Sequence, residues 1–370
     1  MLYLCQNIDK LIIKKLKIAI GYEVKESSWG GGNQFANSLV KASREKGFEV
    51  SFDLKEKDID IILLTDPRSY TKTVSFGSFE IIFYLLFKNN RALVVHRINE
   101  CDERKNTKYM NSFLKWANYC ADYTVFISSW LRNLDLYQKD KPSKVILNGA
   151  DKQIFRSYSK NYWDGNSPLK IVTHHWSPNN MKGWDVYKKL DDLMSNSYWR
   201  NLIEFTYIGN LPEGFKFKNS RYLKPMNGNK LGEELSKHDL YISASINEPA
   251  GMHHIEGILC GLPIIYRNSG ALPEYCNNYG ISFKDSNYLP ALKEIMVNYN
   301  FYKKNVSKYP NTADQMTKEY LDLFSFLLKR RDEIIKKRNL LRSPFLILNN
   351  FFIFLIKSKN VVKLFNKIRK

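Results

Sequence analysis

Two glutamates separated by seven residues are the side chains best placed for chemistry in this sequence. Glu248 and Glu256 bracket the run PAGMHHI and follow the apolar segment 240–245 (LYISAS), which predicts a buried strand. Open α/β sheets bind ligands at the carboxyl ends of their strands, so we expect Glu248 in the loop after this strand and Glu256 about two turns into the next helix. A carboxylate accepts hydrogen bonds from neighbouring hydroxyls, so one glutamate suits a ribose and the other a hexose.

The same helix is expected to bind a diphosphate at its N-terminus. It should begin near Gly251, where free backbone N–H groups attract anions and the missing side chain permits close approach. Met252 and His253 are expected to line the pocket. His253 and His254 diverge by about 100° on a helix, which disfavours a shared metal ion. Lys182, in the run MKGWDV beside another predicted helix start, is a second phosphate ligand.

A glycine-rich segment (WGGGNQF, 29–35) follows the first predicted strand and opens the first predicted helix. Gly31 and Gly32 are the candidates here for close approach to a ligand. A dinucleotide-binding turn is an alternative, because Asp53 lies at a suitable distance along the chain for a ribose contact. Phe35 occupies the position at which such a turn needs its third glycine, so binding of a nicotinamide cofactor is the weaker interpretation.

Together these motifs resemble glycosyltransferase family 4, over roughly residues 17–330. The resemblance is carried by Glu-x7-Glu with the later Gly261-Leu-Pro263, by the Lys-Gly-x-Asp run at Lys182, by the glycine loop, and by NGADKQIF at 148–155, which we interpret as a structural turn. It implies that Glu256 binds the donor ribose, Glu248 contacts the donor sugar, Lys182 binds the diphosphate, and the glycine loop approaches donor phosphate and acceptor. It also implies retention of configuration, with no covalent intermediate and no essential metal.

One departure affects the phosphate site. Many relatives have an arginine shortly before the lysine, whereas the run HHWSPNNM at 174–181 has none. Either His174, His175 or the basic tail substitutes for it, or the phosphate pocket differs from that of the family.

The resemblance also places acceptor-side residues at the end of the predicted strand 93–98, in the run HRINECDER. We expect His96 to bind the donor sugar or leaving phosphate and Asp102 to orient an acceptor hydroxyl. For each of them, a polar strand end solvated in a loop is the competing interpretation. The run Asp58-Ile-Asp60 spells a metal-binding motif of another glycosyltransferase architecture, but it stands among charged residues before a strand and is interpreted as a solvated strand entrance.

Strand-like and helix-like segments alternate twice along the chain, which is typical of α/β folds with parallel sheets. The polar stretch 157–168 separates the two blocks. We therefore predict the GT-B fold, with two doubly wound Rossmann-like domains facing each other across a cleft and a C-terminal helical basic tail. The expected divisions are an acceptor-side domain (1–157), a linker (158–168), a nucleotide-sugar-binding domain (169–311), a long helix (312–331) and a basic amphipathic tail (332–370).

The net charge of +20 is concentrated at the C-terminal end, since residues 301–370 carry 17 basic and 5 acidic residues. From 334 to 370 there are ten basic residues and no acidic one. Such a tail suits an anionic membrane surface, and packing back onto the first domain is the main alternative. The run 344–356 is apolar but too short to span a bilayer. No recognition motif supports specific nucleic-acid binding.

Five scattered cysteines and the absence of a secretory pattern indicate free thiols and a cytoplasmic protein, peripheral on the membrane if the tail binds lipid. The sequence therefore predicts a retaining glycosyltransferase that moves a sugar from a nucleotide-diphosphate sugar to a glycan or lipid-linked acceptor. An inactive nucleotide- or glycan-binding relative and a basic nucleic-acid-binding protein are the alternatives.

Overall fold

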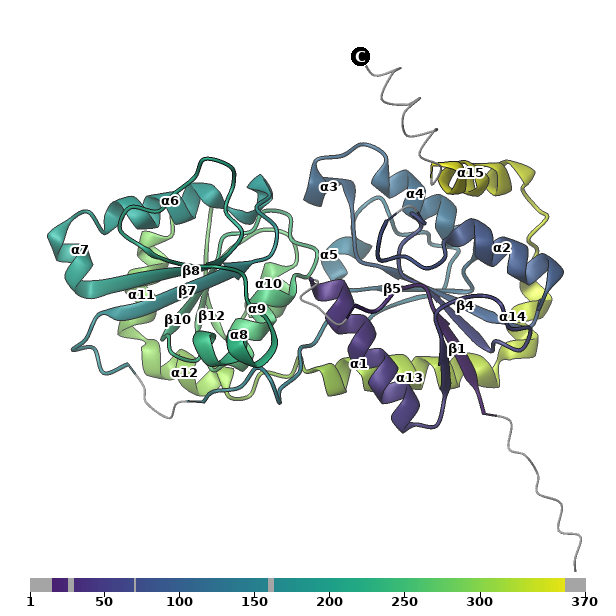
Figure 1. Ribbon diagram of the computed structural model, residues 1–370, viewed down its shortest axis with the longest axis horizontal. Coiled ribbons are helices and arrows are strands. Elements are labelled where there is room, and N and C mark those ends of the chain that lie inside the picture. The colour runs from purple at the N-terminus through teal and green to yellow at the C-terminus, as the bar shows by residue number, and fades with distance from the viewer. Residues whose placement is uncertain (1–14, 26–29, 70, 159–162, 357–370) are drawn as a thin grey trace, which may run out of the picture.

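A computed structural model of the chain describes residues 15–25, 30–69, 71–158 and 163–356. It contains two six-stranded parallel sheets, each flanked by helices and each formed from one half of the sequence (Figure 1). The long helix that ends the second half runs back beneath the first sheet. The GT-B architecture predicted from the sequence, with two Rossmann-like domains, is therefore confirmed.

The first sheet has the order β2-β1-β3-β4-β5-β6. Its central strands are mostly apolar and are buried on both faces, as expected when helices cover both sides of a parallel sheet. The strands are β1 (Lys17–Ile20), β2 (Glu49–Ser51), β3 (Ile61–Leu64), β4 (Leu93–Ile98), β5 (Tyr123–Phe126) and β6 (Ser143–Val145). The helices of this half are α1 (Gly31–Glu45), α2 (Ser78–Phe87), α3 (Asp102–Lys105), α4 (Met110–Ala117), the 3-10 turn η1 (Asn118–Cys120) and α5 (Ser129–Arg132).

The second sheet has the order β12-β11-β10-β7-β8-β9. Its strands are β7 (Leu169–His175), β8 (Ile203–Gly209), β9 (Arg221–Leu223), β10 (Leu240–Ser243), β11 (Ile264–Arg267) and β12 (Gly280–Phe283). The helices are η2 (Asn180–Lys182), α6 (Trp184–Leu193), α7 (Ser197–Leu202), α8 (Gly228–Leu235), α9 (Met252–Leu259), α10 (Leu272–Cys276), α11 (Leu289–Val297) and α12 (Tyr299–Val306). The two edge strands β9 and β12 were not predicted, because they are short and largely lack buried apolar side chains.

Helix α13 (Ala313–Lys329) joins the end of the second half to the first domain. The Ala313 N–H donates to the Ala150 carbonyl at 2.8 Å, beside the bridge between Ala150 and Thr312. A Cβ on Gly149 would lie 2.0 Å from the Thr312 carbonyl oxygen, so this crossing needs a glycine. Farther along, the Tyr320 ring contacts Phe35 of α1 at 5.2 Å between centroids, so α13 completes the first domain's core.

The segment after α13 packs against the first domain as far as residue 356. Helix α14 (Arg331–Lys337) precedes Arg338, whose guanidinium forms a buried ion pair with Asp122. In α15 (Pro344–Leu355), the Asn350 side chain donates to the Trp116 carbonyl, and the Phe351 ring contacts Phe79 of α2.

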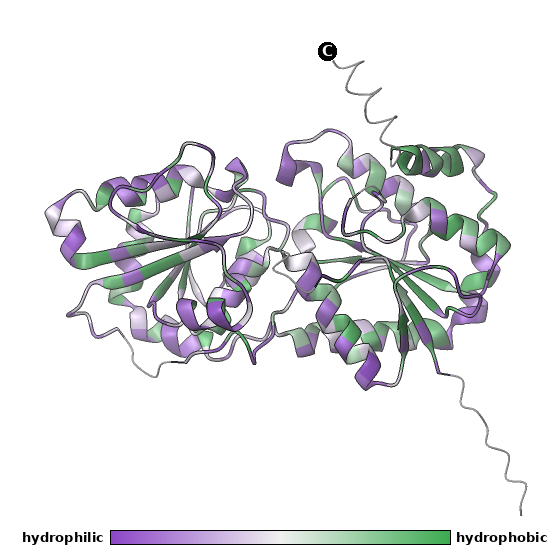
Figure 2. Cartoon of the chain, viewed as in Figure 1, coloured by the Kyte–Doolittle hydropathy of each residue, from purple (hydrophilic) through white to green (hydrophobic). Residues whose placement is uncertain are grey.

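Up to residue 356, the predicted basic amphipathic tail (332–370) therefore packs back onto the first domain, which was the alternative to membrane binding. Within it, α15 carries no charge and is largely apolar along its length (Figure 2). The amphipathic pattern predicted from Val361 to Ile368 lies outside the described residues. Among the helices that the structure describes, none is long and apolar enough to cross a bilayer.

Candidate active site

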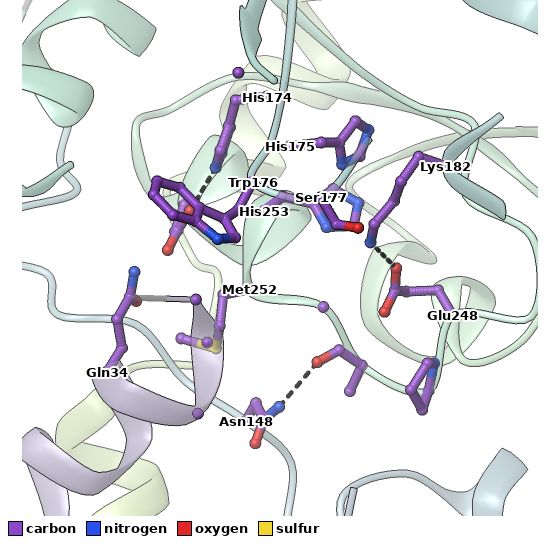
Figure 3. A pocket seen from close by; sticks show the side chains of 18 of the residues that line it. Gln34, Asn148, His174, His175, Trp176, Ser177, Lys182, Glu248, Met252 and His253 are labelled. Carbon is purple, nitrogen blue, oxygen red and sulfur yellow. Dashed lines mark hydrogen bonds and ion pairs between the residues drawn. The ribbon is translucent and has the colours of Figure 1, made fainter. Parts of the chain in front are cut away.

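A cleft of about 320 Å³ lies where the carboxyl ends of strands from both sheets meet. Its lining comes from both domains, and Figure 3 shows the side chains that project into it. The predicted residues that line it are Gly31, Gly32, Lys182, Glu248, Gly251, Met252, His253 and Glu256. The structure thus brings together eight of the ten residues selected from the sequence.

Two helix N-termini converge on this cleft. Gly251 caps α9, and a Cβ there would lie 2.6 Å from His253 Nδ1 and 3.0 Å from the Glu248 carboxyl carbon. Gly31 begins α1, and a Cβ there would lie 2.5 Å from Met252 Cγ. The glycines therefore let the tip of α1 approach the tip of α9, and their free N–H groups form a favourable site for an anion.

Glu248 lies between two cations. Lys182 Nζ donates to Glu248 Oε2 at 2.6 Å, and Arg104 Nε of the first domain lies 3.3 Å from Glu248 Oε1. Burial alone would raise the pKa of Glu248, but Arg104 and Lys182 together lower it to about 2. Burial and the charge of Arg104 lower the pKa of Lys182, against the effect of Glu248. The carboxylate is thus ionised and joins the two domains across the cleft.

The backbone around this pair is held by two glycines with positive φ. Gly183 follows Lys182 with φ +86°, and a Cβ there would lie 2.1 Å from the Ala244 carbonyl oxygen. Gly270 has φ +63°, and a Cβ there would lie 2.4 Å from the Glu248 nitrogen. The close packing of Gly270 against the Glu248 backbone fixes the loop that presents this carboxylate.

Glu256 is held by a histidine whose tautomer is set by its own partners. Tyr241 Oη accepts the His174 backbone N–H at 3.1 Å and lies 3.0 Å from His174 Nδ1, to which it can donate its proton. His174 Nε2 then carries the ring proton and donates to Glu256 Oε2 at 2.5 Å. Glu256 Oε1 is buried and has no hydrogen-bond partner within the described residues. This oxygen is available to a ligand hydroxyl.

The other cleft histidines are neutral. His253 Nε2 lies 2.8 Å from Ser243 Oγ, and His175 Nε2 lies 2.7 Å from Tyr187 Oη. Burial, together with the neighbouring cations and imidazoles, holds the pKa of both rings well below the usual range. They contribute hydrogen-bonding groups rather than charge, so the lysine and the arginines carry the positive charge of the cleft.

His96 and Asp102 do not line the cleft. His96 is fully buried, with Nδ1 3.1 Å from Asn118 Oδ1, and burial lowers its pKa to about 4. The Asp102 carboxylate accepts backbone N–H groups at Tyr109, Met110 and Asn111, so it caps the start of α4. The structure therefore corrects the expected positions of both residues, since neither lines the cleft.

Several residues that line the cleft were not selected from the sequence. Arg97, Asn99, Glu100 and Arg104 stand at the end of β4 or just after it. Alternation along β4 could have indicated that Arg97 and His96 lie on opposite faces of the sheet, so that only one of them would line the cleft. Asn148 was interpreted only as a turn residue.

In the structure, Asn148 accepts from Arg97 at 2.9 Å and donates to the Ala250 carbonyl at 2.9 Å, so it connects the two domains beside α9.

The Asp58-Ile-Asp60 run lies away from this cleft. Asp58 pairs with Lys17, and buried Asp60 accepts from the Lys17 backbone N–H and from Arg331. These contacts are structural. Within the described ranges, no group of three or more His, Cys, Asp or Glu side chains is arranged to hold a metal ion.

Comparisons with known proteins agree with this fold. Residues 216–294 match the family model "Glycosyl transferases group 1". No curated protein matches the chain. The catalytic domain of starch synthase IV from Arabidopsis thaliana, bound to ADP and acarbose, superposes with a TM-score of 0.63 at 14% identity, covering 85% of this chain and 100% of that one.

Two further solved structures show the same fold. Sucrose-phosphate synthase from Thermosynechococcus elongatus has a TM-score of 0.59 at 14% identity, covering 85% of this chain and 100% of its own. HepE from Anabaena, in complex with UDP-glucose, has a TM-score of 0.59 at 12% identity, covering 84% of this chain and 100% of its own.

Proposed function

We propose that this chain, a glycosyltransferase of the GT-B fold, transfers a sugar with retention of configuration from a nucleotide-diphosphate sugar to a glycan or lipid-linked acceptor. The observation that carries the proposal is the convergence of the α9 N-terminus, the Lys182–Glu248 pair and the free oxygen of Glu256 in one cleft. A donor combines a diphosphate with two hydroxyl-bearing rings, and these three features match those three parts.

The donor would lie across the cleft with its diphosphate at Gly251 and Met252. Backbone N–H groups of α9, the Lys182 ammonium and Arg104 would stabilise the negative charge that develops on the leaving diphosphate. Glu256 Oε1 would accept from a ribose hydroxyl, and Glu248 would contact the transferred sugar. Trp176, half exposed in the same cleft, offers a ring face for the base.

In the transfer step, the acceptor oxygen bonds to the anomeric carbon while the bond from that carbon to the diphosphate oxygen breaks. The electron pair leaves with the diphosphate, and the acceptor proton passes to the leaving oxygen on the same face. A dry, closed cleft limits capture of the sugar by water. The proposal includes neither an essential metal nor a cofactor, because the cations and the helix N-terminus supply the positive charge.

The experiment is donor turnover with UDP-, GDP- and ADP-sugars, followed as release of the nucleoside diphosphate. We expect turnover with one base and a loss of about 100-fold in Glu256→Ala. Turnover that persists in the presence of a chelator supports the metal-free scheme. Nucleotide binding without turnover on any acceptor would favour an inactive relative. Failure to bind any nucleotide sugar, with Glu256→Ala unchanged, contradicts the proposal.

The second part of the proposal is an anionic membrane surface as partner, on the cytoplasmic side. Helices α2 and α15 lie side by side through the Phe79 and Phe351 rings, and they expose large apolar side chains. The exposed fractions are 52% for Phe83, 70% for Phe87 and 69% for Phe345. Contiguous exposed apolar area of this kind marks an interaction surface.

The distribution of charge around this apolar surface favours a bilayer over a protein as its partner. Helix α15 contains no charged residue, and the sequence that follows it, 357–370, has six basic residues and no acidic one. Apolar insertion beside a basic segment is the pattern of interfacial membrane binding. This replaces the expectation that the whole of 334–370 binds lipid, since α14 and the inner face of α15 are occupied by the first domain.

Flotation with vesicles tests this surface. We expect wild-type protein to float with vesicles containing phosphatidylglycerol and not with pure phosphatidylcholine, and Phe87→Asp/Phe345→Asp to lose binding about tenfold or more. Phe301→Asp is the matched control, because Phe301 is 62% exposed on α12 in the other domain. Equal binding of all three proteins contradicts a membrane role for this surface. Salt-sensitive binding to nucleic acid, unaffected by these substitutions, would indicate only non-specific attraction.

A further inference from the structure

The cleft contains three carboxylates, and their oxygens are not equally occupied. Both oxygens of Glu248 face cations, and Glu256 has one oxygen held by His174. The third carboxylate is Glu100, which follows β4 in the first domain. Its Oε1 lies 3.0 Å from Lys105 Nζ, and its Oε2 is buried without a hydrogen-bond partner among the residues that the structure describes.

A buried carboxylate oxygen without a partner is costly unless a ligand satisfies it. The Glu100 side chain is 16% exposed, so little water reaches it. Lys105 fixes one oxygen and leaves the other for a donor group in the cleft. Among the residues described, each domain thus presents to the cleft one buried carboxylate oxygen without a partner, that of Glu100 from the first domain and that of Glu256 from the second.

We infer that Glu100 binds the reacting hydroxyl of the acceptor, through a hydrogen bond from that hydroxyl to Oε2. The inference rests on the proposed function, since it assigns the acceptor half of the same cleft. The acceptor class is therefore an alcohol, such as a sugar hydroxyl, and not an amine that is protonated at neutral pH and offers no free lone pair.

The position of Glu100 in the cleft fits the transfer step. In a retaining transfer on one face, the acceptor hydroxyl must lie beside the leaving diphosphate. Glu100 lines the same cleft as Arg104 and Lys182, the two cations that we assign to the diphosphate. Its charge contributes to raising the pKa of Arg104 and opposes the lowering of the pKa of Lys182. A carboxylate there orients the O–H bond, and the leaving diphosphate receives the proton.

Glu100 takes over the role that the sequence suggested for Asp102. The Asp102 oxygens accept the hydrogen bonds that cap α4. Glu100 stands two residues earlier, just after the carboxyl end of β4, and lines the cleft. The donor half of the cleft does not require Glu100, because every phosphate and ribose contact proposed above is made by other residues. Removal of the Glu100 carboxylate should therefore slow transfer while leaving donor binding unchanged.

The test compares Glu100→Gln with wild type in two measurements. The first is the rise in melting temperature caused by UDP, GDP or ADP, which reports donor binding. The second is hydrolysis of the matching sugar donor, in which water takes the place of the acceptor alcohol. We expect Glu100→Gln to keep the nucleotide-dependent shift and to lose hydrolysis by tenfold to 100-fold. Glu103→Gln is the matched control, because Glu103 lies outside the cleft lining, and it should change neither measurement.

Two results overturn the inference. Wild-type hydrolysis by Glu100→Gln would show that the oxygen plays no part in the reaction. Parallel loss of the nucleotide shift and of hydrolysis would place Glu100 in the donor site instead. If no nucleoside diphosphate stabilises the wild-type protein, the proposed function and this inference are overturned together. That result is distinguishable from the other two because it needs no variant.

Discussion

His174 Nε2 lies 2.5 Å from Glu256 Oε2, and this contact leaves the other oxygen of Glu256 free in the cleft. The two residues come from β7 and α9, 82 positions apart in the sequence. Neighbouring side chains therefore orient the carboxylate before any ligand arrives, which lowers the entropy cost of binding a ligand hydroxyl.

Replacing His174 should weaken nucleotide binding by releasing Glu256. We expect His174→Ala to raise the Kd for the preferred nucleoside diphosphate about tenfold, since a hydrogen bond to a charged group contributes about 1.5–3 kcal/mol. His174→Gln, which keeps a donor, should recover part of the loss. A 3′-deoxy nucleotide should lose less affinity on His174→Ala than its parent. Equal losses for both nucleotides would contradict the orienting role.

The sequence predicted the fold, and it located the second-domain residues that line the cleft, for a physical reason. Strands β4, β7 and β10 are buried along almost their whole length, and Glu248, Gly251 and Lys182 stand at the strand-to-helix junctions where such sheets bind ligands. Local spacing is enough to locate these junctions.

The first-domain site was harder to predict, because it depends on which side chains face the cleft. His96 and Asp102 have suitable chemistry, but the first is buried beside Asn118 and the second is satisfied by backbone N–H groups. The packing of α15 on α2 was also beyond prediction, since 272 residues separate Ser78 from its partner Asn350. Contacts over such separations leave no periodic pattern in the sequence.

Substitution of Gly270 should reduce both the stability of the protein and its donor turnover. In Gly270→Ala, the new Cβ would meet the Glu248 backbone nitrogen and also suffer from the positive φ. We expect a loss of about 1–3 kcal/mol in the free energy of unfolding and at least a tenfold loss of donor turnover. Gly47→Ala is the matched control, because Gly47 has φ +80° in open space. If both variants lose turnover equally, the Gly270 contact does not position Glu248.

Arg104 should affect catalysis from the first domain. Arg104→Gln removes one of the two cations at Glu248 and one charge proposed for the leaving diphosphate, so kcat should fall by about 100-fold. Arg91→Gln, at an exposed pair with Asp332 on the outer surface, is the control and should leave kcat unchanged. Steady-state kinetics decide between these outcomes, and an unchanged kcat in Arg104→Gln would remove it from the phosphate site.

Acid should destabilise the protein through its buried imidazoles. Burial lowers the pKa of His254 to about 3 from 6.5, so His254 is neutral in the folded chain and takes up a proton on unfolding. Its contribution to stability is complete above pH 6.5 and is lost as the pH falls from 6.5 towards 3.

The slope is about 1.4 kcal/mol per pH unit for each such group. We expect His254→Leu to reduce the dependence of the free energy of unfolding on pH between 6 and 4 by about this amount, measured by urea denaturation at each pH. Glu248, with a pKa of about 2, adds stability above its ordinary pKa of 4.5 that is lost below it. An identical slope in His254→Leu and wild type would mean that His254 is protonated in the folded protein.

The most direct test of the central claim is calorimetric titration of the protein with UDP, GDP and ADP. We predict that one of them binds with one site per chain, and that Lys182→Ala weakens this binding at least tenfold. Lys115→Ala, at an ion pair with Asp135 outside the cleft lining, should not weaken it. A chain that binds none of the three, or one whose affinity is the same in Lys182→Ala, would contradict the assignment of the cleft to a nucleotide-diphosphate sugar.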